Sequence, residues 1–301
     1  MPQASQSVRS LHTWKLTIAY DGTGFSGWQV QPGEATIQGE LQAALGRVTG
    51  ERPLPQGSGR TDAGVHALGQ VASFELAAAI PAANLQRALN RTLPAAIRVL
   101  EARRVRSDFH ARHSAVAKTY EYRVFQETIC PPFMARYVLV CAWPMDLEAL
   151  REAAPQFVGE HDFLSFAATE PDLVTRMNEA GDEATGEAED GQAVDNGEAD
   201  SPRTKAADKG TVRRVFSSEW DQVESEPGRI LIYRVRGNGF LHHMVRNMVG
   251  TMLDVGRGRT VPGQIPEILA ARSRAAAGPT APAQGLFLKS VEYPEGYELA
   301  E

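Results

Sequence analysis

The feature that most limits the fold is an order of secondary-structure patterns that occurs twice along the chain. In the first half, apolar residues alternate as in strands or recur every three to four residues as in helices. The order there is strand, helix, strand, strand, helix, strand, at about 13–22, 36–48, 53–59, 69–76, 82–93 and 97–105. The second half repeats this order at about 117–125, 146–158, 211–224, 229–237, 239–256 and 285–293.

This order is the split βαβ, or ferredoxin-like, arrangement. It predicts an α+β protein with two such domains, at 14–108 and 114–294, preceded by an N-terminal tail at 1–13. We expect the two sheets to join into one mainly antiparallel sheet flanked by helices. A central active-site cleft is expected between the domains, because ligand sites favour domain boundaries.

A strongly acidic stretch interrupts the second predicted domain. Residues 168–200 hold eleven acidic residues and one arginine. Because the whole chain has a net charge of −6, the rest of the chain is at +4. The later part of the stretch is poor in large apolar residues, so it cannot bury enough surface to offset the entropy of ordering. We therefore expect a disordered insertion at about 173–210 and a mildly basic folded part that a polyanion could bind.

The remaining composition argues against membrane and metal-binding classes. No apolar run approaches the roughly 20 residues that span a bilayer. Cys130 and Cys141 lack the spacing of metal ligands and are expected to be reduced core thiols, which favours a cytoplasmic protein. The stretch HHMVR at 242–246 does not match the zinc-binding pattern HExxH. We expect no membrane association, no metal and no cofactor.

The loop GRTDAG at 59–64 holds a single carboxylate, Asp62, between two glycines and close to Arg60. Glycines allow backbone conformations closed to other residues and a close approach to a ligand. A nearby cation lowers the pKa of a carboxyl group and keeps it ionised, as a nucleophile at neutral pH requires. The alternative is a hydrogen-bonded turn aspartate with a solvated arginine beside it.

Arg246 is a second candidate for the site. In the predicted helix at 239–256, His242, Arg246 and Gly250 follow each other along the border of the apolar face. A half-buried arginine at this border needs an anion, such as Asp62 or a phosphate. The alternative is an arginine whose stem covers the core while its charged end stays in water.

Tyr120 is a third candidate, in the predicted strand at 117–125. By alternation it shares one face of the strand with Lys118 and Tyr122. A tyrosine at the open edge of a sheet can stack on a nucleic-acid base. The alternative is an ordinary core residue, as most strand tyrosines are.

Two other stretches carry weaker signals. The glycine-rich stretch at 20–31 fits neither a dinucleotide-binding nor a P-loop pattern, and we expect a loop that exposes Phe25 and Trp28. At the predicted domain boundary, His110, Arg112 and His113 could contact a phosphate or simply form a hinge.

Five motifs in order, YDGTGFSGWQVQ, GRTDAGVHA, FHARHSA, KTYEYRVF and GNGFLHHMVRNMVG, resemble the tRNA pseudouridine synthase A family over nearly the whole chain. The resemblance implies isomerisation of uridine to pseudouridine at positions 38, 39 and 40 in the anticodon stem-loop of tRNA, by a cofactor-free homodimer. It further implies that Asp62 is the nucleophile and Tyr120 the base-stacking residue, with Arg60 and Arg246 as the basic residues around the aspartate. The acidic insertion departs from the usual pattern of the family.

The implied chemistry fits the candidate residues. Pseudouridine formation breaks the C1′–N1 bond, rotates the detached uracil and rejoins it through C5, which requires no redox step, energy input or metal. The target base must first leave its stack. Asp62 could attack C1′, abstract the 2′ proton of the ribose or attack C6, and the sequence does not choose among these routes.

Two other functions fit parts of the pattern. A non-catalytic RNA-binding module also uses paired split βαβ domains with exposed aromatic residues, but it gains nothing from a carboxylate that faces phosphates. A metabolic enzyme such as a phosphotransferase would place metal-binding acids beside Asp62, and the loop has none.

Overall fold

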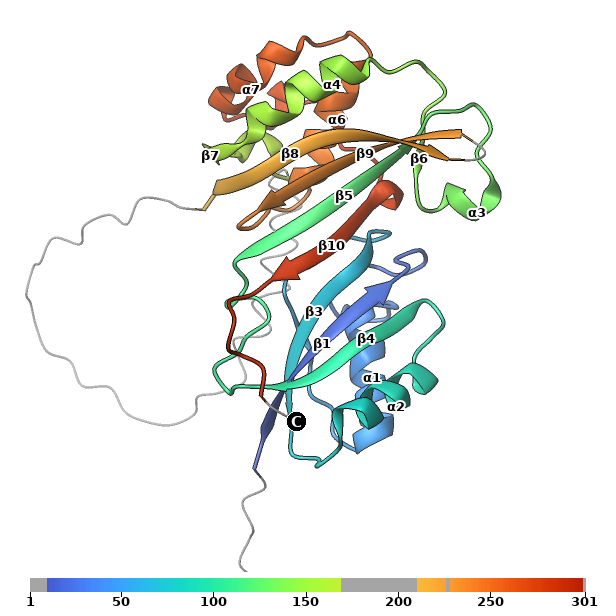
Figure 1. Ribbon diagram of the computed structural model, residues 1–301, viewed down its shortest axis with the longest axis vertical. Helices are drawn as coiled ribbons and strands as arrows, with labels where there is room; N and C mark the ends of the chain where they lie inside the picture. The colour runs from blue at the N-terminus through green and yellow to red at the C-terminus, as the bar shows by residue number, and fades with distance from the viewer. Residues whose placement is uncertain (1–9, 169–209, 226–227, 300–301) are drawn as a thin grey trace, which may run out of the picture.

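The computed structural model describes residues 10–168, 210–225 and 228–299. Within these residues it contains one mixed, mainly antiparallel sheet with helices packed against both halves (Figure 1). The predicted α+β class with a joined sheet is confirmed.

The first half follows the predicted order of elements. Its elements are β1 (His12–Tyr20), α1 (Ile37–Thr49), β2 (Gln56–Gly57), β3 (His66–Leu76), α2 (Ala82–Thr92) and β4 (Ile97–Val105). Every second residue of β1 from Trp14 to Tyr20 is buried, as the alternation predicts. Helix α1 begins after Thr36, whose hydroxyl accepts a hydrogen bond from the N–H of Gly39 and so satisfies a free helix donor.

The second half also follows the predicted order, with short additions. Its strands are β5 (Ala117–Phe125), β6 (Leu139–Val140), β7 (Gly159–Asp162), β8 (Val212–Ser225), β9 (Gly228–Gly237) and β10 (Leu286–Glu292). Its α-helices are α3 (Pro132–Ala135), α4 (Leu147–Ala153), α6 (Met244–Gly256) and α7 (Ile265–Ala271). No helix of the described residues is long and apolar enough to cross a membrane.

The last strand, β10, joins the two halves of the sheet. The strand order is β4-β1-β3-β10-β5-β9-β8-β7, with β2 beside β3 and β6 beside β5. It pairs in antiparallel register with β5, where Leu288 faces Tyr120, and in parallel register with β3, where Phe287 faces His66. Residues 14–108 and 114–294, predicted as two domains, therefore share one sheet. The predicted insertion at 173–210 lies outside the described residues except for Gly210, and so does most of the predicted tail at 1–13.

The helix predicted at 239–256 begins only at Met244. His243, the residue before it, has a φ of 59°, a left-handed conformation that cannot continue a right-handed helix. Residues 240–243 form a loop instead, in which the carbonyl of His242 accepts a hydrogen bond from the N–H of Ala168 (3.0 Å). The prediction that His242 and Arg246 lie on one helical row is therefore wrong for His242.

Four smaller predictions are corrected. Proline residues, which lack an N–H for the ladder, shorten the strand predicted at 53–59 to β2, and Pro155 turns the end of the helix predicted at 146–158 into a 3-10 turn. Trp28, predicted to be exposed, is buried against the ring of Tyr20. Both cysteines are free, but only Cys141 is a core thiol, because Cys130 is partly exposed.

Candidate active site

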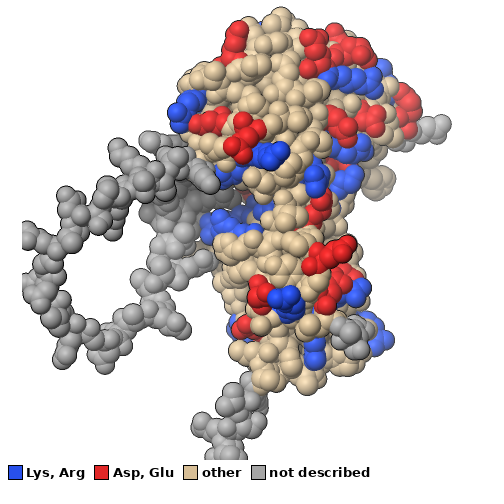
Figure 2. Space-filling view, turned by 60° about the vertical axis from the view of Figure 1, so that its left-hand side comes forward, with Lys and Arg blue, Asp and Glu red and all other residues tan. Residues whose placement is uncertain are grey.

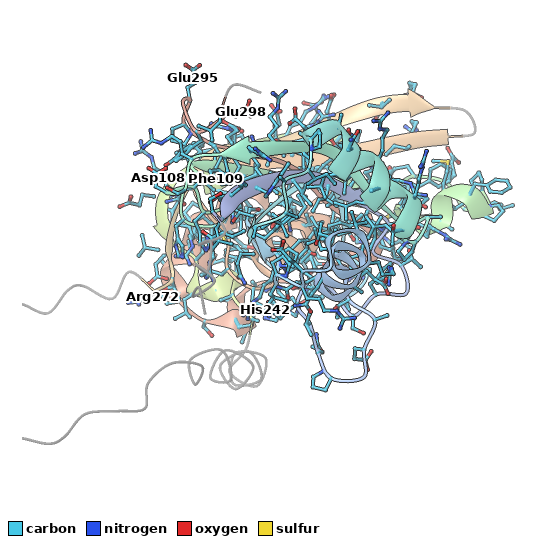
Figure 3. The ribbon with its side chains drawn as sticks, turned by 90° about the horizontal axis from the view of Figure 1, so that it is seen from below. Asp108, Phe109, His242, Arg272, Glu295 and Glu298 are labelled. Carbon is cyan, nitrogen blue, oxygen red and sulfur yellow. The ribbon has the colours of Figure 1, made fainter. Side chains whose placement is uncertain are left out.

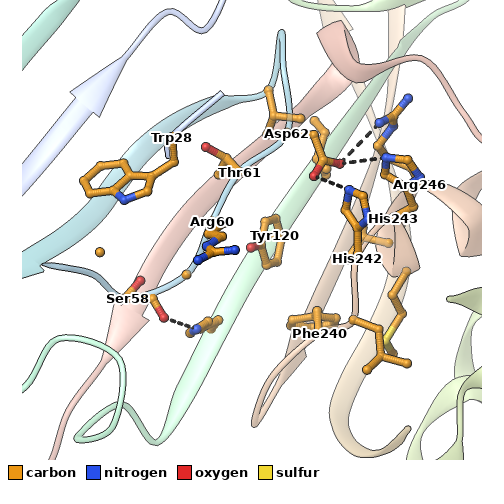
Figure 4. Close-up of a pocket in the computed structure, with 18 of the residues that line it drawn as sticks. Trp28, Ser58, Arg60, Thr61, Asp62, Tyr120, Phe240, His242, His243 and Arg246 are labelled. Atoms are coloured by element: carbon orange, nitrogen blue, oxygen red, sulfur yellow. Dashed lines mark hydrogen bonds and ion pairs between the residues drawn. The ribbon is translucent and has the colours of Figure 1, made fainter. Parts of the chain in front are cut away.

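A pocket of about 370 Å³ lies where the two halves of the sheet meet (Figure 4). The loop at 56–62 forms one wall, β5 contributes Lys118 and Tyr120, and residues 240–246 form the opposite wall. Among the described residues that line it, Asp62 is the one carboxylate. In the view from below, the pocket residue His242 lies on the opposite side of the molecule from Glu295 and Glu298, so the site faces away from the C-terminal segment (Figure 3).

The backbone around Asp62 is fixed by the neighbouring glycine-rich loop. The N–H of Trp28 donates to the carbonyl of Thr61 (3.0 Å). Gly27 has a φ of 90°, and a Cβ at this position would lie 2.6 Å from the same carbonyl oxygen. Because both the conformation and the space require glycine, the two loops can pack closely and hold Asp62 in place.

The two glycines that flank Asp62 have different roles. Gly64 has a φ of 76°, and the N–H of Val65 closes a turn by donating to the carbonyl of Asp62 (3.1 Å). Gly59 has no such left-handed conformation, but a Cβ there would lie 3.0 Å from Nζ of Lys118. The prediction of an unusual backbone conformation is therefore confirmed for Gly64 and wrong for Gly59, where glycine leaves room for a side chain.

Three side chains from the opposite wall surround the carboxylate of Asp62 (Figure 4). Nε2 of His242 lies 3.2 Å from Oδ1. Nε2 of His243 and Nη1 of Arg246 lie 3.5 Å and 3.3 Å from Oδ2. All four side chains are at most 22% exposed, so these contacts are little screened by water.

These contacts keep Asp62 ionised. Burial by itself would raise the pKa of the Asp62 carboxyl. The hydrogen bond from His242 and the charges of His242, His243 and Arg246 outweigh burial and lower the pKa to about 2. At neutral pH the pocket therefore holds a carboxylate anion that is fixed by several donors.

Arg246 is the arginine that contacts Asp62. It lies in the first turn of α6, and its Nε donates to the carbonyl of Ala281 (2.7 Å), which aims the guanidinium at the carboxylate. The prediction that a half-buried Arg246 pairs with an anion is confirmed, and the anion is Asp62. Arg60 lines the same pocket, beyond Tyr120 in Figure 4.

Tyr120 lies between Arg60 and the Asp62 cluster in Figure 4. It is 8% exposed, and its ring packs edge-on against Phe240, with the ring centroids 5.1 Å apart. The side chain belongs to the core, as the alternative reading expects, and it also lines the pocket, so stacking on a base stays a prediction. The predicted pairing of Lys118 and Tyr120 on one face of the strand is confirmed.

The sequence pattern does not predict His242 and His243 as partners of Asp62, because the stretch at 242–246 lacks the HExxH pattern and its apolar spacing predicts a helix through both histidines. The available signal was the pair of adjacent histidines four and three residues before Arg246. The left-handed backbone at His243 ends the helical pattern there, and both rings contact Asp62.

Asp62, His242 and His243 are also residues that can ligate a metal. Among the described residues they form a group whose ligand atoms lie within 4.8 Å of one another. The guanidinium of Arg246 already contacts the same carboxylate and carries a permanent positive charge. A metal cation would have to compete with it, so the arrangement is better suited to neutralising a carboxylate by hydrogen-bond donors.

Comparison with known proteins gives a consistent result. A family model described as tRNA pseudouridine synthase matches residues 16–114 and 196–294. The chain is 46% identical over 279 residues to tRNA pseudouridine synthase A of Solibacter usitatus, covering 93% of this chain and 98% of the relative. It is 44% identical to the protein of the same name from Moorella thermoacetica and 41% identical to that from Bacillus pumilus, each over 93% of this chain and 98% of the relative. The chain therefore belongs to the tRNA pseudouridine synthase family.

Proposed function

We propose that this protein isomerises uridine to pseudouridine at positions 38, 39 and 40 in the anticodon stem-loop of tRNA, with Asp62 as the nucleophile or base. The observation that carries the proposal is the ionised carboxylate of Asp62, held by His242, His243 and Arg246 in the wall of a pocket. A passive RNA-binding surface has no use for such an anion. The identity to proteins named tRNA pseudouridine synthase A supports the same reaction.

The reaction begins with extrusion of the target uridine, because C1′ and C6 are inaccessible in a stacked helix. Asp62 then attacks C1′ or abstracts the 2′ proton of the ribose, and attack on C6 is a third route. In each case the C1′–N1 bond breaks, the uracil turns, and a new bond joins C1′ to C5. The proton leaves C5 and N1 gains one, so the product is an isomer and no redox cofactor is consumed.

Tyr120 would hold the uracil face-on while it is detached, and its hydroxyl would be available to accept the C5 proton. Arg246 would keep Asp62 ionised and aimed at the ribose. Arg60, on the other side of Tyr120, would contact the RNA. These proposed roles are supported by the position of all three side chains in the lining of the pocket that holds Asp62.

We further propose that the protein is a cytoplasmic homodimer whose residues 14–108 and 114–294 are related domains. Sedimentation or light scattering in solution would measure the mass of the assembly. A monomer that is fully active at nanomolar concentration would contradict the dimer without affecting the reaction.

The test is incubation of the protein with an unmodified tRNA transcript that has uridines at positions 38 to 40, followed by mapping of pseudouridine at single-nucleotide resolution. We expect product at these positions with the wild-type protein and none with Asp62→Asn, which is nearly isosteric but cannot act as a nucleophile. The matched control is Asp108→Asn, because Asp108 is an exposed carboxylate outside the pocket. RNA binding without turnover by the wild-type protein would identify a passive module, and turnover by Asp62→Asn would remove Asp62 from the mechanism.

A further inference from the structure

We infer that Arg112, Lys118 and Arg213 form a binding site for one backbone phosphodiester of the RNA strand that enters the pocket. The inference rests on the proposed function in that the ligand is RNA, but it concerns a different part of the pocket from Asp62. It gives a role to Arg112, which the sequence leaves between a phosphate contact and a hinge.

Lys118 is the centre of this site. It lies on β5 two residues before Tyr120 and lines the same pocket. Its Nζ donates to the carbonyl of Ser58 and occupies the space that the missing side chain of Gly59 leaves. The amine is therefore held beside the loop of Asp62 by a neutral acceptor, which leaves its charge uncompensated.

The charges around Lys118 have the same sign. Burial, followed by the positive charges of Arg112 and Arg213, lowers the pKa of Lys118 to about 8. Arg213 is the second residue of β8, and its Nε would lie 3.7 Å from a Cβ at Gly239, the residue before the pocket residue Phe240. Its Nη1 donates to the carbonyls of Val212 and Gly210, and burial lowers its pKa. Within the described part of the chain, none of these three cations forms an ion pair with a carboxylate.

The opposite face of the same strand shows what a compensated arrangement looks like. Glu121, on that face of β5, is buried and accepts from Arg123, Arg234 and Lys289, at 2.9, 3.2 and 3.1 Å. On the pocket face the one lining carboxylate, Asp62, is already engaged by Arg246 and two histidines. Three cations close to one another, with no carboxylate partner among the described residues, are electrostatically unfavourable, and a bound ligand could supply the anion.

The ligand class follows from this chemistry and from the location. A phosphodiester carries one permanent negative charge and two acceptor oxygens, which suit one ammonium and two guanidinium groups. Figure 2 shows basic side chains gathered in the hollowed middle of the molecule, where the two halves of the sheet meet. A strand that places a uridine beside Asp62 and Tyr120 would pass Lys118, two residues along β5, with an adjoining phosphate.

The test uses anticodon stem-loop RNAs in which one phosphate at a time is replaced by a neutral methylphosphonate, with binding measured by equilibrium titration. All proteins carry Asp62→Asn, so that turnover does not interfere. We expect one linkage next to the target uridine whose neutralisation weakens binding about tenfold. In the Lys118→Gln and Arg112→Gln variants, the unmodified RNA should already bind about tenfold more weakly. Neutralising the same linkage should then cause no further loss of RNA affinity in these variants.

Two controls make the result specific. Arg91→Gln removes one positive charge from the exposed face of α2, outside the pocket, and should leave the methylphosphonate profile unchanged. Arg112 is an exposed loop residue, so its substitution tests the site even if Lys118→Gln fails to fold. The slope of the logarithm of the RNA-binding constant against the logarithm of the salt concentration should become shallower by about one for each positive charge removed from the site.

Additive losses from the variant and the methylphosphonate, or unchanged RNA affinity in both variants, would overturn the phosphate site. Competition by inorganic phosphate at millimolar concentration, with no linkage of the RNA affected, would identify a site for free phosphate and overturn it as well. Pseudouridine mapping with the unsubstituted protein, run in parallel, reports on the proposed function independently.

Discussion

Nη1 of Arg246 lies 3.3 Å from Oδ2 of Asp62, although 184 residues separate the two in sequence. Asp62 comes from a loop of the first half of the chain and Arg246 from the first turn of α6 in the second half. The pair therefore forms only when both halves are folded and joined through β10. Together with the contacts of His242 and His243, this pair makes Asp62 an ionised, oriented group instead of a solvated turn residue.

Arg246→Lys tests this relationship. Lysine keeps the positive charge but has no planar fork to bond the Ala281 carbonyl and Asp62 together. We expect kcat to fall about tenfold, in proportion to one lost charge-assisted hydrogen bond, with little change in RNA affinity. Single-turnover kinetics on the tRNA transcript would measure this. An unchanged kcat would mean that the charge alone suffices.

His242 should act on Asp62 as a hydrogen-bond donor. Its Nε2 lies 3.2 Å from Oδ1. His242→Gln can place an amide N–H near the same point, whereas His242→Ala cannot. We expect kcat to be lower in the alanine variant than in the glutamine variant, and the acidic limb of its pH–rate profile to move to higher pH, because the carboxylate loses a bond that favours its charged form. Equal losses with unmoved profiles would indicate a packing role only.

Asp62 should also make the stability of the protein depend on pH. Its pKa is about 2 in the folded state, below its ordinary value of 3.8. This lowered pKa corresponds to about 2 kcal/mol of stability. The contribution is fully present above pH 3.8 and is lost as the pH falls through 2. Urea unfolding of wild type and Asp62→Asn at several pH values should show the wild-type advantage shrinking as the pH falls from about 4 to 2. A constant difference over this range would contradict the assignment.

Tyr120 should contribute through both its ring and its hydroxyl. Tyr120→Phe keeps the ring for stacking, whereas Tyr120→Leu removes the ring and its edge contact with Phe240. We expect both variants to react more slowly, and the leucine variant to bind substrate more weakly by about 1–3 kcal/mol. Binding and single-turnover rates with the tRNA transcript would separate these effects. Wild-type rates in both variants would place Tyr120 outside the reaction.

The acidic segment provides a prediction that rests on the sequence. A stretch at net −10 on a body at +4 should not lie in the RNA-binding surface. Replacing residues 173–208 by a short Gly/Ser linker should preserve folding and activity, because loop closure depends weakly on length. If the segment competes with RNA, its removal should tighten tRNA binding at low salt, and the gain should shrink as salt rises. Weaker binding or misfolding after the deletion would contradict both outcomes.

Much of the fold is determined by local sequence. The alternation in β1, β4 and β5 and the helical spacing in α1 and α2 predict these elements within a few residues, because each period reflects which side of one element is buried. The glycine-bounded loop also singles out Asp62. The same alternation places Lys118 and Tyr120 on one face of β5 without reference to the rest of the chain.

The arrangement of the site is decided by tertiary structure. His242 and His243 reach Asp62 only because the backbone at His243 turns left-handed where the loop from β9 meets α6, against a helical pattern that the sequence continues to 239. Trp28 is buried because the loop that carries it packs onto the loop of Asp62. The insertion of β10 between β3 and β5 brings the two walls of the pocket together. Such contacts join residues far apart in the chain, so no local period encodes them, whereas the strands and helices are specified by the side chains they themselves carry.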